Sequence, residues 1–79
     1  MDKHEFEQFV PEHGKDILRF CRMNAGSTER GNELYQDTMV KLLEKQKKLD
    51  VAQNIKSYAM QTAILLWKAR KIRRRNRHF

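Results

Sequence analysis

Residues 54–76 read NIKSYAMQTAILLWKARKIRRRN and predict a long helix. Side chains that suit a buried face recur at steps of three and four residues, the spacing of one side of a helix: Ile55, Tyr58, Thr62, Leu65, Ala69 and Ile72. Asn54 stands where an N-cap residue is favoured. The first half of this helix is apolar enough to lie at the centre of a core. The segment from Lys68 to Arg77 instead holds seven Lys or Arg in ten positions.

A second helix is predicted from Ser27 or Thr28, either of which can cap it, to about Gln46. Its apolar face comprises Leu34, Met39, Leu42 and Leu43, with Thr38 beside them. The loop before it contains Gly26, a residue suited to the C-terminus of the preceding helix.

The N-terminal segment has helical spacing on both sides of Pro11. Proline lacks the backbone N–H and clashes with the preceding turn. We therefore expect a short helix to about Val10 and a separate one from about Glu12 to Met23. Together these segments predict an all-α fold, a compact three-helix bundle with a short extra N-terminal helix, as a single domain over residues 1–79.

The charge is divided unevenly along the chain. Lys plus Arg number 17 and Asp plus Glu number 10, a formal net charge of +7. Residues 1–50 hold 9 basic and 10 acidic side chains, whereas residues 51–79 hold 8 basic and none that is acidic. A near-neutral body with a strongly basic end indicates a polyanionic partner or an anionic surface.

Several function classes are excluded by composition. The longest apolar run, Ala63–Trp67, has five residues, against about 20 for a membrane span. No secretory signal is visible near Met1, so the cytoplasm is the expected location. The three histidines are dispersed and Cys21 is the only cysteine, so we expect no metal site, no cofactor and no enzymatic activity.

Two polar clusters precede the basic run. Glu33, Gln36 and Asp37 share one helix face and suit a partner's Arg or Lys, although a solvated face would look the same. The second cluster lies at the start of the last helix and has the hydrogen-bonding and stacking groups of single-strand readers: Gln53, Asn54, Lys56, Ser57, Tyr58 and Gln61. Capping by Asn54 and core packing by Tyr58 are the alternatives.

The order of these features resembles a known family. ELYQDT at residues 33–38 resembles the acidic-Leu-x-Gln-acidic-Thr motif of bacterial sigma factors of the sigma-70 family, most closely the extracytoplasmic-function group. The stretch from Ile55 to Ala63, followed by the basic run, also resembles that family. The resemblance covers nearly the whole chain and corresponds to region 2.

The resemblance implies a helical domain that docks on the β′ clamp helices of core RNA polymerase. It also implies capture of the non-template strand of the promoter −10 element, and an anti-sigma factor as a further partner. By motif, Glu33, Gln36 and Asp37 would face the polymerase, and Leu34 and Met39 would be core or docking positions. Residues 49–58 with Gln61 would meet the melted strand. The basic side chains would hold DNA phosphates: Lys68, Arg70, Lys71, Arg73, Arg74 and Arg77.

The chain departs from the family pattern at Leu65 and Ala69, where members often carry Asn and Asp, so a promoter preference does not transfer. No helix-turn-helix follows, and we expect the chain to be part of a longer factor. Two other interpretations of the chain's function stay open. One is a helical nucleic-acid-binding regulator without polymerase contact. The other is a peripheral membrane protein using the basic helix, which has Trp67 beside its cations.

Replacing Arg73→Ala together with Arg74→Ala should weaken DNA binding and flatten its salt dependence. Each phosphate neutralised contributes about 0.7 to the slope of log affinity against log salt for single strands. A salt titration with a single-stranded oligonucleotide measures this slope. An unchanged slope would contradict the assignment of the basic run to nucleic acid.

Overall fold

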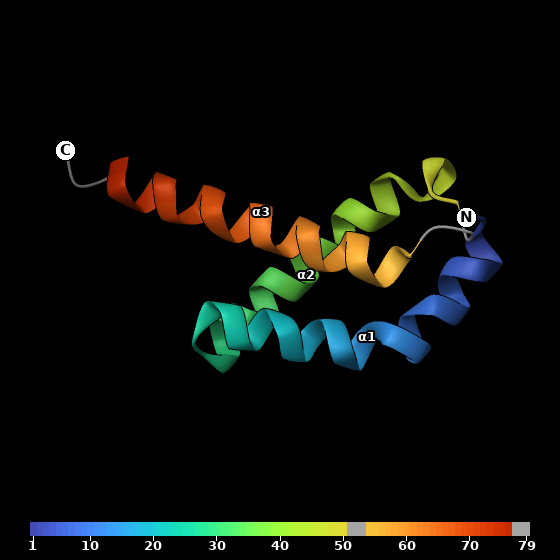
Figure 1. Cartoon of the computed structure of the whole chain (residues 1–79), viewed down its shortest axis with the longest axis horizontal. Coiled ribbons are helices and arrows are strands. Elements are labelled where there is room, and N and C mark those ends of the chain that lie inside the picture. Colours follow the sequence, from blue (N-terminus) through green and yellow to red (C-terminus); the bar gives the residue numbers. More distant parts are fainter. Residues whose placement is uncertain (51–53, 77–79) are drawn as a thin grey trace.

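A computed structural model describes residues 1–50 and 54–76, with side chains described as far as Lys71. It contains α1 (Lys3–Ala25), α2 (Thr28–Glu44), a 3-10 turn η1 (Gln46–Lys48) and α3 (Ile55–Asn76). In these residues every regular element is helical, which confirms the all-α prediction with three main helices. Figure 1 shows α1 and α3 running in the same sense and α2 crossing obliquely in the opposite sense. The C-terminal end of α3 projects beyond the other two helices (Figure 1).

The predicted helix ends are confirmed where local capping decides them. Gly26 closes α1 in the left-handed region, with φ of 76°. The Ser27 hydroxyl accepts a hydrogen bond from the Arg30 N–H (3.2 Å) at the start of α2. The Asn54 side chain accepts one from the Ser57 N–H (3.0 Å) at the start of α3. Each cap satisfies a backbone group that the helix itself leaves without a partner.

The predicted break at Pro11 is wrong, because α1 continues through it and there is no separate N-terminal helix. Pro11 is exposed, so the one carbonyl that loses its intrahelical donor lies on the solvent side. Phe9 and Ile17, on either side of the proline, are buried in the same core. Their burial outweighs the local cost of the proline. The ribbon of α1 bends in its N-terminal half (Figure 1), as expected for an internal proline.

The buried face of α3 also differs from the predicted stripe. Ile55, Ala59 and Ala63 are buried, whereas Leu65 is 67% exposed and Ala69 is exposed. At 3.6 residues per turn, Leu65 lies about 80° from Ile55 around the axis, on the side away from the two alanines. The small alanines let α3 pack closely on the other two helices. This close packing determines which face of α3 is buried.

The core is built around the inner face of α2. Leu34, Thr38 and Leu42 are fully buried, while Leu43, expected on this face, is 56% exposed. The Thr38 hydroxyl donates to the Leu34 carbonyl (2.7 Å), so the buried polar side chain is satisfied within its own helix. The remaining buried apolar side chains come from α1, from α3 and from Leu49.

Gly31 marks the closest approach of α2 to α1. A Cβ atom added there would lie 2.4 Å from the Arg22 Cα. We predict that Gly31→Ala destabilises the domain by about 1–3 kcal/mol, although alanine is the better helix former, because the backbones must move apart. Chemical denaturation measures the change.

Gly14→Ala is the matched control, since its added Cβ would meet side chains and no backbone: the Tyr35 hydroxyl at 3.0 Å and the Val10 Cγ1 at 3.9 Å. Gly14→Ala should lower the free energy of unfolding by less than Gly31→Ala does. Equal stabilities of the two variants would contradict the close approach of α2 to α1.

Candidate nucleic-acid interface

The outer face of α2 carries the polar residues of the 33–38 motif. Glu33, Gln36 and Asp37 are all exposed. One and two helical turns after Gln36, Val40 and Leu43 are also exposed, at 52% and 56%. Sequence reasoning missed this apolar continuation, because Leu43 was placed in the core and Val40 was not considered. We call Gln36, Val40 and Leu43 the α2 outer patch.

The two apolar residues assigned as core or docking positions lie on the inner side. Leu34 has no exposed surface, and Met39 is half-buried against the core. Leu34 therefore acts through packing and is closed to a partner.

Arg70 connects α3 to the acidic side chains of α2. Its guanidinium lies 3.7 Å (Nη1 to Oε2) from Glu33 and donates a hydrogen bond to the Asp37 carboxylate. The Arg70 side chain is 26% exposed, so it is partly withdrawn from solvent. Sequence reasoning assigned Arg70 to DNA phosphates and the two carboxylates to a partner. The structure brings all three groups together within one chain.

The start of α3 carries the cluster predicted to meet a single strand. Ser57 and Gln61 are exposed, and Tyr58 is half-buried against the core. Lys56 pairs with Asp16 of α1 (Nζ to Oδ2, 2.7 Å), which joins α1 to α3. Gln53 lies outside the described residues.

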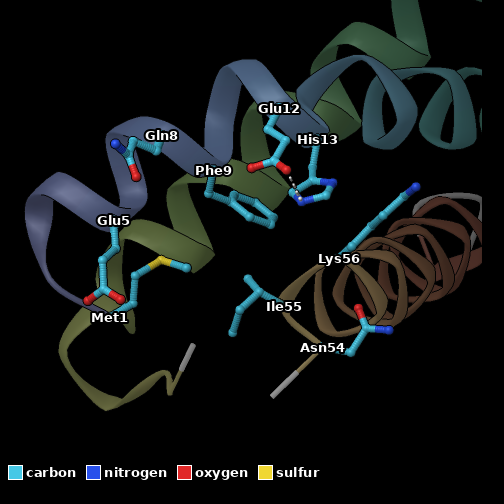
Figure 2. Close-up of a pocket in the computed structure, with 9 residues that line it drawn as sticks. All are labelled: Met1, Glu5, Gln8, Phe9, Glu12, His13, Asn54, Ile55 and Lys56. Carbon is cyan, nitrogen blue, oxygen red and sulfur yellow. Dashed lines mark ion pairs between the residues drawn. The ribbon is translucent and has the colours of Figure 1, made fainter. Parts of the chain in front are cut away.

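Beside this cluster is a cavity of about 520 Å³ between α1 and the start of α3 (Figure 2). The Phe9 and His13 rings face it with their centroids 5.0 Å apart. The lining combines apolar side chains with amide, carboxylate and ammonium groups: Met1, Glu5, Gln8, Phe9, Glu12, His13, Asn54, Ile55 and Lys56. Sequence reasoning found the α3 side of this cavity and missed the α1 side, which only the packing of the helices brings near. Such a lining suits a flat polar group.

The basic half of α3 begins with two exposed lysines, Lys68 and Lys71. The Lys71 Nζ lies 5.6 Å from the centroid of the Trp67 ring, in a cation–π arrangement. The backbone of α3 carries Arg73 and Arg74 on the projecting end, and their side chains lie outside the described residues, as does Arg77.

Metal ligation and membrane crossing find no support in residues 1–50 and 54–76. No three His, Cys, Asp or Glu side chains gather there in a metal-binding arrangement. None of the helices in that part of the chain is long and apolar enough to cross a membrane.

Comparison with known families identifies the class of protein. The family model described as Sigma-70 region 2 matches residues 9–78, which include α1 from Phe9 onward and the whole of α2 and α3. The chain therefore belongs to the sigma-70 region 2 family. Domains of this family are non-enzymatic parts of transcription initiation factors and serve in polymerase binding and promoter melting. Searches of curated proteins and of solved structures gave no significant match.

The Lys56–Asp16 contact predicts a measurable titration effect. The hydrogen bond and charge of Lys56 lower the pKa of Asp16. A lowered pKa stabilises the fold above the pKa that Asp16 has in the unfolded chain, and this contribution is lost as pH falls through the folded value. Lys56→Gln should raise the pKa of Asp16 toward its ordinary value in an NMR titration.

Lys15→Gln removes the same charge from the residue next to Asp16 and should leave that titration nearly unchanged. If both variants gave the same titration as the unmodified chain, the contact between α1 and α3 would be wrong.

Proposed function

We propose that this chain is the region 2 domain of an extracytoplasmic-function type of sigma factor. It docks on the β′ clamp helices of core RNA polymerase through the outer side of α2. It captures the non-template strand of the promoter −10 element at the start of α3. The observation that carries the proposal is the separation of two surfaces on one rigid bundle. The α2 outer patch is exposed polar and apolar surface, and the basic end of α3 projects away from it.

Docking is supported by the chemistry of the α2 outer patch. An amide beside two exposed apolar side chains resembles the anchors of a protein interface, where apolar contacts supply energy and a polar rim supplies specificity. None of the three side chains is needed inside the core, so they are available to a partner.

Strand capture is supported by the cavity beside Asn54 and Lys56. Taking a base from the stack costs a few kcal/mol, and stacking and pocket contacts return about 1–3 kcal/mol per base. A cavity with an aromatic wall and an amide at its rim is suited to one unpaired base. The exposed Ser57 and Gln61 follow on the next turns of α3, and the basic run then attracts the phosphates.

The remaining parts of the proposal come from the family alone. The cytoplasm is the proposed location, since core polymerase and promoter DNA meet there. An anti-sigma factor is a further proposed partner, which would inhibit by covering either the outer side of α2 or the basic end of α3. We also propose that residues 1–79 form one domain and that a helix-turn-helix domain belongs to the complete factor.

Val40→Ala with Leu43→Ala should weaken binding to a β′ clamp-helix fragment by about tenfold while thermal stability stays the same. These residues are chosen over Asp37 because Asp37 also holds Arg70, so its loss would change a contact with α3 as well as the docking surface. Affinity is measured by calorimetry or by a quantitative pull-down.

The matched control is Met23→Ala on α1, which removes another side chain that is largely exposed, at 76%. It should bind like the unmodified chain. If the double variant kept full affinity for the clamp helices, docking through α2 would be wrong. Retained DNA binding in such a chain would then favour a nucleic-acid regulator without polymerase contact.

A further inference from the structure

Arg70 stands between the two surfaces of the proposed function. It belongs to the basic segment of α3, yet its guanidinium lies against Glu33 and Asp37 on α2. Those carboxylates belong to the motif expected to receive a partner's Arg or Lys. One cation of the nucleic-acid surface is therefore held by two anions of the protein-binding surface.

The ion-pair cluster of Arg70, Glu33 and Asp37 is open enough for another cation to take the place of Arg70. The Glu33 and Asp37 side chains are 68% and 50% exposed, so a second cation can reach them from solvent. Ion pairs of such exposed groups contribute little to the stability of a fold. Breaking the cluster therefore costs less than losing a core contact. Arg70 also lies four residues before Arg74, an arrangement in which like charges repel and a phosphate relieves the repulsion.

We propose that Arg70 is an exchangeable residue that couples the two surfaces, an inference that rests on the proposed function. In the free domain, Asp37 and Glu33 hold its guanidinium. When a cationic side chain of the clamp helices takes these carboxylates, Arg70 turns to a phosphate of the DNA strand. Polymerase binding then raises the affinity for DNA, and by thermodynamic linkage DNA raises the affinity for polymerase by the same factor.

A double-mutant cycle tests the exchange of Arg70 between the carboxylates and a phosphate. The quantity measured is the salt dependence of the chain's affinity for an oligothymidylate. Glu33→Gln/Asp37→Asn releases Arg70 and should add one phosphate contact, which steepens the salt slope by about 0.7. Arg70→Gln alone should leave the slope of the free domain unchanged, because the carboxylates already hold Arg70. Adding Arg70→Gln to the Glu33→Gln/Asp37→Asn variant should return the salt slope to that of the unmodified chain.

Glu7→Gln/Glu29→Gln is the charge-matched control, since it removes two exposed carboxylates with no described contact to α3. It should raise affinity slightly without the Arg70-dependent change of slope. If Arg70→Gln had the same effect on the slope in both backgrounds, the exchange would be overturned. Circular dichroism checks that each variant is folded.

A second measurement needs no acidic variant. A saturating β′ clamp-helix fragment should raise oligothymidylate affinity in the unmodified chain, and this gain should be lost in Arg70→Gln. An equal gain in both chains would overturn the exchange while leaving the proposed function standing. The proposed function itself would fail in a different way, through clamp-helix binding that is insensitive to Val40 and Leu43.

Discussion

The burial of the inner face of α2 against both other helices is the constraint on which the structure depends. Leu34, Thr38 and Leu42 are fully enclosed, and the one polar group among them is satisfied by its own helix. A small domain has few such positions, so each of them matters to its stability. Because the inner face is fixed, the rotation of α2 about its axis is fixed as well. Gln36, Val40 and Leu43 are thereby held on the outside.

The sequence was sufficient for the features that neighbouring residues decide. The caps at Ser27 and Asn54, and the close of α1 at Gly26, were predicted correctly because each depends on a few adjacent groups. Pro11 was misjudged, since the packing of Phe9 and Ile17 keeps the helix intact through it. Local propensity alone cannot weigh that tertiary gain.

The candidate site was predictable in part for the same reason. The outer position of Gln36 followed from helical periodicity. The α1 wall of the cavity, the exposure of Leu65 and the pairing of Arg70 with Asp37 did not. All three depend on which helices touch and at what angle, and Arg70 lies 33 residues from Asp37 in the chain. The uneven charge distribution also gains a physical meaning, because part of the basic end is balanced by acids of the body.

We propose that the outer side of α2 meets the β′ clamp helices of core RNA polymerase. A photo-crosslinking amino acid placed at Gln36, in a chain assembled with core polymerase, tests this contact. We expect a crosslink that maps to the β′ clamp helices and is absent when the same group is placed at Lys15, on α1. A crosslink at Gln36 that maps elsewhere on the polymerase, or equal crosslinking from both positions, would contradict it.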